Sequence, residues 1–279
     1  VLAPRGVAIG PAGAACIPKP SSPVGNSRVR YQKPVPAAID EWTHYLHDPS
    51  NNAVSQDTEI HPPKHLQWVG SPRYSRHHDH MSAMSACVTA NGRIYHIMDE
   101  ASRLSIYLQP EWKLVARDAF NGTLLWKRDI DVWYNHMQRR KSGPAYLPRK
   151  LVADGDTLYA APGIHAPAVA IDGATGKTLQ TYVPDMPCDE IVHSDGTLFL
   201  VGAATDAGEN SVDARALQGT ASPRLVPVNA AAGEVLGTAA AMLPCFAVTT
   251  GPDDAHVHDC EATEWRCRGA GAMHCEPSL

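Results

Sequence analysis

The stretch VARDAFNGTLLW, from Val115 to Trp126, has two further copies later in the chain. VAIDGATGKTLQ begins at Val169, and the weaker copy VPVNAAAGEVLG begins at Val226. In each copy an Asp or Asn lies three residues after the valine, a glycine lies four residues after the Asp or Asn, and a leucine lies three residues after the glycine. The Asp or Asn falls at positions 118, 172 and 229, so 54 and 57 residues separate the copies. Such regular spacing predicts a repeat architecture.

A β-hairpin signal precedes each copy. Asn91-Gly92, Asp154-Gly155 and Asp195-Gly196 each separate two short apolar runs, and these dipeptides are the strongest short-range sign of a hairpin. The hairpin, a strand that ends near the valine, and a strand that carries the leucine make four strands per repeat. A four-stranded antiparallel unit repeating every 40 to 55 residues or so is typical of a β-propeller blade. The sequence therefore predicts an all-β chain with an incomplete β-propeller of about three to four blades; a β-sandwich with similar hairpins is the alternative.

The repeated Asp or Asn has a structural and a chemical interpretation. At the first position of a tight turn its side chain accepts hydrogen bonds from the backbone N–H groups just ahead, while the glycine takes a positive φ. A residue that recurs once per repeat is expected to do the same work in each, which favours the turn over a catalytic carboxylate. The predicted structural motif comprises Asp118, Gly122, Asp172, Gly176, Asn229 and Gly233.

Composition argues against several other classes of protein. The 279 residues are 44% apolar and 19% charged, with 21 Gly and 23 Pro, which indicates a sizeable core and many turns. The net charge of −5 argues against nucleic acid or an anionic membrane as the main partner. We find no apolar window long enough for a transmembrane segment and no signal peptide at Val1. The 7 cysteines include no CxxC motif.

The chain divides by composition into three parts. Residues 1–36 are rich in Ala, Gly and Pro, and we expect an irregular N-terminal segment. Residues 37–240 hold the predicted blades. Residues 241–279 contain Cys and His without the strand periodicity of the blades, and we expect an irregular tail.

The repeated stretch also carries a family resemblance. The pattern A-x-D-x-x-[TN]-G-x-x-L-W, seen from Ala116 to Trp126 and without its tryptophan from Ala170 to Leu179, resembles the blade motif of pyrroloquinoline-quinone (PQQ) quinoproteins and their non-catalytic relatives. From Trp42 to Tyr182 the chain is similar to PQQ-binding-like β-propeller repeat proteins of a planctomycete type. In that family the blade tryptophan docks between neighbouring blades, which implies a structural role for Trp126 and Gly122. The family's enzymes have six to eight blades, so we expect this chain to be a fragment, with further blades or a domain in sequence outside it.

The resemblance leaves two functions open. The first is a quinoprotein oxidoreductase that uses PQQ and Ca²⁺ to oxidise an alcohol or a sugar-like substrate. The second is a non-catalytic propeller scaffold for protein binding or assembly. The family implies a periplasmic or otherwise exported location, and a small-molecule or protein ligand at the propeller mouth.

One polar cluster is a candidate metal site. His77, His78, Asp79 and His80 bring three imidazoles and a carboxylate into four consecutive residues, and His44 and His47 could join them. A solvated polar loop is the alternative. A second set of metal-binding residue types lies in the tail but matches no zinc-module spacing; it comprises His256, His258, Asp259, Cys260, Cys267, His274 and Cys275.

A quinoprotein enzyme also needs a carboxylate base and oxygen ligands for Ca²⁺. Asp99, Glu100 and Asn135 are of the right type, but no motif assigns any of them to that role. The sequence therefore identifies no catalytic base.

Overall fold

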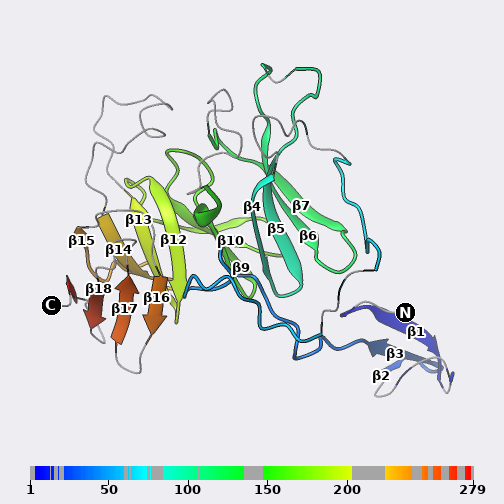
Figure 1. The fold of residues 1–279 in the computed structure, drawn as a ribbon. Helices are drawn as coiled ribbons and strands as arrows, with labels where there is room; N and C mark the ends of the chain where they lie inside the picture. Colours follow the sequence, from blue (N-terminus) through cyan, green and yellow to red (C-terminus); the bar gives the residue numbers. More distant parts are fainter. Residues whose placement is uncertain are drawn as a thin grey trace.

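The structure is a computed structural model, and it describes residues 4–12, 14–15, 18, 22–59, 62, 64–73, 76, 84–105, 107–134, 147–202, 224–240, 247–250, 254–258, 264–268 and 274–277. Within these residues the strands form five antiparallel sheets, one with three strands and four with four strands (Figure 1). The chain is all-β, as predicted, and its four-stranded sheets are propeller blades. The described part contains no helix long and apolar enough to cross a membrane.

Each blade is built from strands that are consecutive in the chain. Blade 1 consists of β4 (Met84–Ala90), β5 (Arg93–Asp99), β6 (Trp112–Asp118) and β7 (Leu124–Asp129). Blade 2 consists of β8 (Leu151–Asp154), β9 (Thr157–Ala160), β10 (Ala168–Asp172) and β11 (Thr178–Tyr182), preceded by the 3-10 helix η1 (Leu147–Lys150). Blade 3 consists of β12 (Cys188–Ser194), β13 (Thr197–Gly202), β14 (Arg224–Asn229) and β15 (Ala239–Ala240).

The first strand of each blade lies next to the first strand of the following one. Strand β8 is close to both β4 and β12, and β12 is close to β16 of the fourth sheet. The outer strands β7, β11 and β15 lie at the opposite edges of their sheets. This radial order, with the first strand innermost, is the arrangement of blades around a propeller axis.

The three predicted hairpins are confirmed as β4–β5, β8–β9 and β12–β13. In the first of them Asn91 and Gly92 have φ of 48° and 69°, which two-residue hairpin turns require. The third strand, predicted to end near the valine, ends three residues after Val115. Strand β6 continues to Asp118, because the Asp118 N–H still donates to the Thr123 carbonyl across the strand pair at 2.9 Å.

The faces of the blades are buried against each other. Leu151 of β8 belongs to an apolar cluster with Tyr95 and Leu114 of blade 1, whereas the next residue, Val152, belongs to a cluster with Leu198 of blade 3. Successive side chains of a strand point to opposite faces, so blade 2 is covered on both sides. No blade could bury both of its faces alone, and stacking therefore stabilises the array.

The repeated motif forms the same turn in all three blades. The Asp118 carboxylate accepts the N–H groups of Phe120 and Asn121 at 2.9 and 3.0 Å, and the Asp118 carbonyl accepts the Gly122 N–H at 2.9 Å. Equivalent bonds form at the other two copies; their carboxylate or amide acceptors are Asp172 and Asn229. Gly122, Gly176 and Gly233 have φ of 74°, 73° and 73°. The repeated Asp or Asn thus organises a tight turn that is closed by a backbone hydrogen bond between residues four apart.

Each of these turns receives a side chain from earlier in the chain. The Trp126 indole donates to the Gly173 carbonyl at 2.9 Å and lies against Gly176, so blade 1 is fastened to the turn of blade 2. Gln180 of blade 2 lies in the same way against Gly233 of blade 3. The turn of blade 1 receives Trp68, whose indole donates to the Ala119 carbonyl at 3.0 Å. Trp68 itself lies outside any strand of the described chain.

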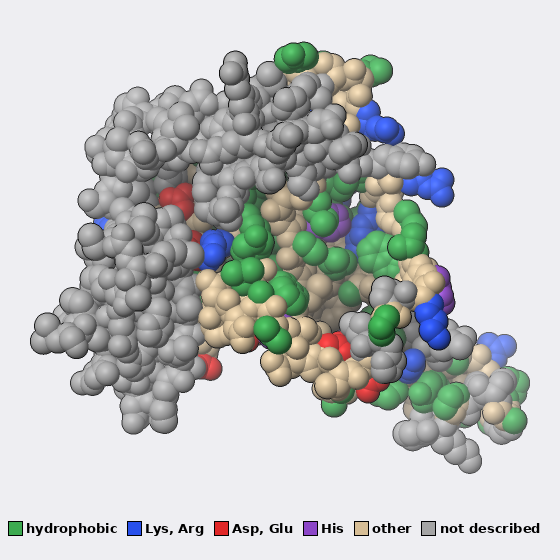
Figure 2. Space-filling model, viewed as in Figure 1, with side chains coloured by type: hydrophobic (Ala, Val, Ile, Leu, Met, Phe, Trp, Pro, Cys, Tyr) green, Lys and Arg blue, Asp and Glu red, His purple; other side chains and the backbone are tan. Residues whose placement is uncertain are grey.

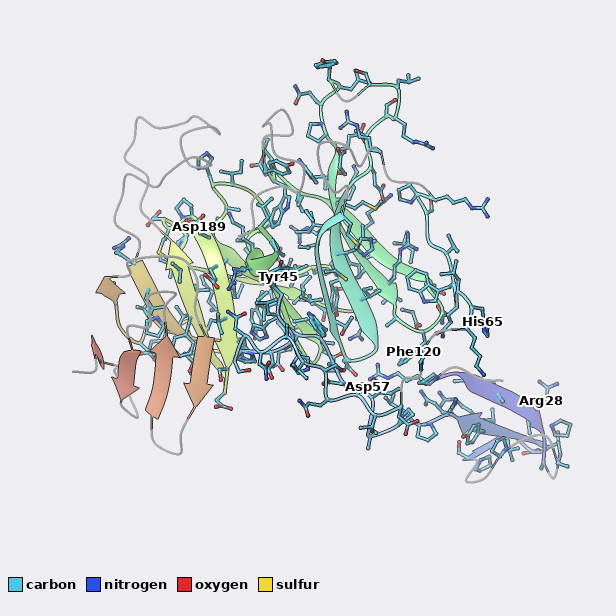
Figure 3. The ribbon with its side chains drawn as sticks, viewed as in Figure 1. Arg28, Tyr45, Asp57, His65, Phe120 and Asp189 are labelled. Carbon is cyan, nitrogen blue, oxygen red and sulfur yellow. The ribbon has the colours of Figure 1, made fainter. Side chains whose placement is uncertain are left out.

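The N-terminal segment differs from the prediction of irregular structure. Strands β1 (Val7–Pro11), β2 (Ser22–Val24) and β3 (Arg28–Gln32) form a sheet with β3 in the centre. The short alternating stretch from Arg28 to Gln32 supplies the central strand, and the Gly and Pro content of its surroundings had suggested a loop. Figure 3 shows Arg28 at the outer end of this sheet, away from the blades.

The C-terminal segment also differs from the prediction of an irregular tail. Strands β16 (Ala247–Thr250), β17 (Asp254–His258), β18 (Glu264–Arg268) and β19 (His274–Pro277) form the fourth four-stranded sheet. The sequences DAHVH and EWRCR do alternate polar and less polar residues with the period of a strand. Their Cys and His content had suggested scattered ligands instead.

The docking of Trp126 on Gly176 yields a matched pair of substitutions. A Cβ at Gly176 would lie 2.6 Å from the Trp126 ring, whereas a Cβ at Gly196, with nearly the same φ of 75°, would meet nothing within 4 Å. We expect Gly196→Ala to lower the free energy of unfolding by about 1 kcal/mol through backbone strain alone. Gly176→Ala should lower the free energy of unfolding by about 2 kcal/mol more than Gly196→Ala does, because the Trp126 ring must also move. Urea denaturation of both variants tests this, and equal losses would contradict the proposed fastening of the blades.

Candidate functional site

The metal cluster predicted at His77, His78, Asp79 and His80 lies outside the described residues, as does Asn135. Arg76, directly before the cluster, is described and almost fully buried. In the described part of the chain no three His, Cys, Asp or Glu side chains lie close enough to hold a metal ion. The metal assignment therefore stays a prediction.

Arg76 is paired with Asp99, one of the candidate carboxylates. The guanidinium donates to Asp99 Oδ2 at 2.7 Å, and both side chains are only 2% exposed. Asp99 Oδ1 accepts the N–H groups of Ala101 and Glu111 at 3.0 and 2.9 Å. Both carboxylate oxygens are thus engaged inside the protein. Asp99 fixes the two ends of the loop between β5 and β6.

The other candidate carboxylate, Glu100, is paired with Lys127 at 2.6 Å. A pocket of about 530 Å³ lies beside these groups, between Pro72, Arg76 and the start of the β5–β6 loop at residues 99–104. That volume is in the range of small-molecule pockets. Its two acidic residues are both held in ion pairs.

A second feature lies at the propeller axis. Residues 40–57, here called the axial segment, run across the innermost strands of the three blades (Figures 1 and 3). The N–H of Thr89 in β4 donates to the Trp42 carbonyl at 2.7 Å, and the N–H of Ala153 in β8 donates to the Thr43 carbonyl at 2.9 Å. The N–H of His193 in β12 donates to His44 Nε2 at 3.1 Å.

These three donors occupy equivalent positions. Thr89, Ala153 and His193 each directly precede the residue pair that closes the hairpin of their blade. An innermost strand has one edge without a neighbouring strand, and buried N–H groups on that edge need acceptors. Three consecutive residues of the axial segment supply one acceptor to each blade. The segment therefore crosses the axis and links the blades there.

The contacts of His44 define its protonation. Its Nε2 accepts the His193 N–H, so the proton of the neutral ring is on Nδ1, which lies 2.8 Å from Thr43 Oγ1. Burial, helped by the nearby His193 and opposed by Asp48, lowers the pKa of His44 from 6.5 to about 3. A protonated His44 would lose its acceptor function at Nε2. The link to blade 3 therefore requires the neutral imidazole.

Asp40 holds the axial segment in its folded shape. Its Oδ2 accepts the Gln56 N–H at 2.6 Å, the Ser55 hydroxyl at 3.0 Å and His47 Nε2 at 2.7 Å. Burial alone would raise the pKa of Asp40, but these hydrogen bonds outweigh it and lower the pKa to about 2. His44 Nε2 is engaged by blade 3 and His47 Nε2 by Asp40, so these two nitrogens already have partners. That His44 and His47 join a metal site stays a prediction, because His77 to His80 lie outside the described residues.

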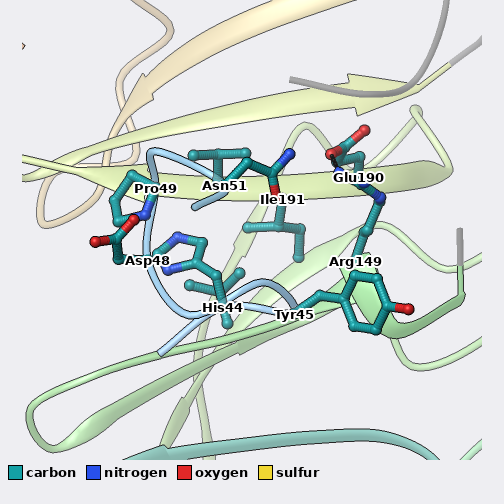
Figure 4. A pocket seen from close by; sticks show the side chains of 10 residues that line it. His44, Tyr45, Asp48, Pro49, Asn51, Arg149, Glu190 and Ile191 are labelled. Carbon is teal, nitrogen blue, oxygen red and sulfur yellow. Dashed lines mark hydrogen bonds and ion pairs between the residues drawn. The ribbon is translucent and has the colours of Figure 1, made fainter. Parts of the chain in front are cut away.

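A small pocket lies between the axial segment and blades 2 and 3 (Figure 4). Its volume is about 10 Å³, about that of one bound water. Figure 4 shows His44 and Asp48 on one side and the ion pair of Arg149 and Glu190 on the other, with the two charged atoms 2.8 Å apart. Tyr45 lies under the Arg149 guanidinium, 5.7 Å from it. The polar groups at the axis are thus packed against each other.

These two pockets do not fit PQQ with Ca²⁺. A tricyclic quinone needs a cavity of several hundred Å³, and the axial pocket has about 10 Å³. The larger pocket has the volume, but Asp99 and Glu100 are bound to Arg76 and Lys127, so neither is placed as a calcium ligand. No step of a quinone reaction follows from the described residues.

Sequence reasoning missed the role of Trp42, Thr43 and His44. The acceptors at Trp42 and Thr43 are backbone carbonyls, which any residue could provide, so no side-chain pattern indicates them. His44 did carry a signal, because it lies three residues before His47 and could join a metal site with it. The sequence suggested a metal, whereas the structure supplies the His193 N–H.

Comparisons with known proteins concern the fold alone. No protein-family model matches the chain, and no curated protein matches it. Among solved structures it is similar to the quinohemoprotein alcohol dehydrogenase from Comamonas testosteroni, with 11% identity over 85% of this chain and 36% of that chain and a TM-score of 0.45. A europium-containing methanol dehydrogenase shows 11% identity over 70% of this chain and 41% of that chain, with a TM-score of 0.40. BamB from Moraxella catarrhalis shows 13% identity over 76% of both chains, with a TM-score of 0.28.

This chain therefore spans less than half the length of either dehydrogenase. Similarity at this level carries no argument about chemistry. The assignment of propeller blades rests on the strand order, the register and the repeated turns.

The buried neutral His44 predicts a pH dependence of stability. The unfolded chain takes up this proton near pH 6.5 and the folded chain only near pH 3, so the unfolded state binds more protons between these values. Stability from this group is fully present above pH 6.5 and is lost as the pH falls towards 3. As the pH is lowered, we expect the free energy of unfolding to decrease more steeply in wild type than in His44→Gln. The two slopes should differ by at most about 1.4 kcal/mol per pH unit.

Urea titrations between pH 7 and pH 4.5 measure the two slopes. His65→Gln, which changes an exposed histidine outside the axial segment, is the control and should follow wild type. Parallel curves for wild type and His44→Gln would show that His44 is not held neutral by the fold.

Proposed function

We propose that this chain is a non-catalytic propeller scaffold that binds another protein. The observation that carries the proposal is the position of the axial segment, whose residues 42–44 accept hydrogen bonds from the innermost strands of blades 1, 2 and 3. A ligand that bound at the hairpin ends of these strands would have to displace these contacts and provide new acceptors for three N–H groups.

The cost of such displacement favours the scaffold. Each buried donor left without an acceptor costs about 1–3 kcal/mol. Arg149 and Glu190 would also have to separate or accept a polar ligand, because their ion pair lines the remaining space. The loops at the ends of the blades remain as binding surfaces, and loops on a rigid scaffold commonly carry recognition.

The alternative that the family resemblance raised is a quinoprotein oxidoreductase with PQQ and Ca²⁺, acting on an alcohol or a sugar-like substrate. The periplasmic or otherwise exported location implied by the same resemblance stays a prediction for both functions.

A titration distinguishes the two functions. Purified protein is titrated with PQQ and Ca²⁺ in a calorimeter and then assayed for dye-linked oxidation of alcohols and sugars. We expect no saturable heat of PQQ binding and no substrate-dependent dye reduction, because neither of the two pockets found among the described residues fits PQQ with Ca²⁺. A quinoprotein dehydrogenase in the same buffer is the positive control. Saturable binding together with dye reduction would overturn the scaffold proposal.

A further inference from the structure

Residues 66–70, here called the edge segment, dock on blade 1 as an outermost blade strand docks on the next blade. The Trp68 indole donates to the carbonyl of Ala119, which directly follows the Asp of the blade 1 turn. The Trp126 indole makes the same bond to the blade 2 turn at Gly173. Each ring also lies against the positive-φ glycine of the turn that it meets. Trp126 belongs to the outer strand β7, so Trp68 occupies the position of an outer-strand residue.

Further contacts fix the edge segment in place. The Gln67 side-chain amide donates to the Phe120 carbonyl, and the Arg117 guanidinium donates to the carbonyl of Ser71, just after the segment. Figure 3 shows His65 and Phe120 on the same side of blade 1, and Figure 2 shows hydrophobic, His and Lys or Arg side chains at the surface on that side of the molecule. A segment that is already ordered loses little conformational entropy when a partner binds, and this favours affinity.

The backbone of the edge segment lacks the pairing that the other outer strands have. Strand β7 pairs with β6, and β11 pairs with β10. Within the described part of the chain, no backbone N–H or carbonyl group of residues 66–70 has a hydrogen-bond partner. The segment carries no charged residue and exposes Leu66 and Val69, by 83% and 61%. An unpaired, uncharged strand edge is a site to which another strand can add.

Strand β7 indicates which backbone groups of an outer strand face its neighbour. The N–H of Ile130, directly after β7, donates to the Trp112 carbonyl of β6 at 3.1 Å. In an antiparallel pair every second residue directs its N–H and carbonyl groups towards the neighbouring strand. Arg128 and Trp126 therefore face β6 as Ile130 does.

The same alternation applied to the edge segment identifies its open donors. Because Trp68 corresponds to Trp126, the backbone N–H groups of Trp68 and Gly70 face the side on which a neighbouring strand would lie. Those of Gln67 and Val69 point away from it. Pro72 stands at the next facing position and has no N–H group, so the pairing ends at Gly70.

The residues opposite the docking side chains indicate the chemistry of the added strand. Ala116 lies opposite Trp126 in the register, and Ala170 lies opposite Gln180. Both alanines are buried, and a valine precedes each of them. Each valine lies opposite the residue after the docking residue, which is Val69 in the edge segment. A strand added there therefore matches these pairs with a small residue preceded by a β-branched one.

We propose that the edge segment binds an extended segment of a partner protein as an added antiparallel β-strand. A small side chain of that strand lies opposite Trp68, and a β-branched side chain lies opposite Val69. The backbone groups of Trp68 and Gly70 make the hydrogen bonds, as the equivalent groups of β7 do with β6. This inference rests on the proposed scaffold function and specifies the surface and the form of the bound segment.

Peptide selection followed by amide hydrogen exchange tests the proposal. Displayed random 12-residue peptides are selected on the full chain, and the enriched ones are synthesised. We expect them to share a step from Val, Ile or Thr to Ala, Ser or Gly. By NMR, the backbone amides of Trp68 and Gly70 should exchange rapidly in the free chain and at least about tenfold more slowly with peptide, whereas those of Gln67 and Val69 should not change.

Two substitutions give an independent readout. Gly70→Pro removes one facing N–H group, and Trp68→Ala removes the side chain that docks the segment on the turn. Each should raise the dissociation constants of the peptides, measured by fluorescence anisotropy, by at least about tenfold. Leu179→Ser, which changes a 61% exposed leucine on β11, is the control and should bind as wild type does. If Gly70→Pro does not fold, Trp68→Ala and the exchange pattern still decide.

The outcomes separate this inference from the scaffold function. Absence of enrichment, peptides that leave Trp68 and Gly70 unprotected, or peptides that bind the two variants as tightly as wild type would overturn the inference and leave the scaffold. Protection of these amides in a dimer without peptide, seen by sedimentation, would overturn the partner protein in favour of a second copy of this chain. Saturable PQQ binding with turnover would reject the scaffold itself.

Discussion

The innermost strands of a propeller leave N–H groups without a neighbouring strand, and the rest of this structure depends on how those groups are satisfied. Here three equivalent donors, Thr89, Ala153 and His193, all bond to consecutive residues of the axial segment. One chain segment thus meets the same need in three blades. It lies against the hairpin ends of these three strands.

The links at the rim of the blades complement those at the axis. Trp126 on Gly176 and Gln180 on Gly233 join successive blades through their turns, and Trp68 extends the series to the turn of blade 1. Blades 1, 2 and 3 are therefore held at their inner edges by the axial segment and are joined to one another through the turns near their outer edges. Separately, the Arg76–Asp99 pair anchors the β5–β6 loop to the end of β5.

Much of the fold could be predicted because its signals are local. The hairpin at Asn91-Gly92 and the turn at Asp118 need only the residues that form them, since positive φ and side-chain acceptors act within a few positions. The sheets at the two ends of the chain were not predicted. The Gly and Pro content of the N-terminal segment suggested a loop, and the Cys and His content of the C-terminal segment suggested scattered ligands, although both segments contain short alternating strands. The partners of Arg76 and His44 could not be predicted, because they lie 23 and 149 residues away.

The central claim is that the axial segment links the innermost strands of three blades. Native-state amide hydrogen exchange of Thr89, Ala153 and His193, followed by NMR, tests it most directly. The account predicts that all three amides are protected to a degree comparable with Ile97 inside blade 1, and that His44→Ala selectively removes the protection of His193. Rapid exchange at Thr89 and Ala153 in wild type, as at an open sheet edge, would contradict it.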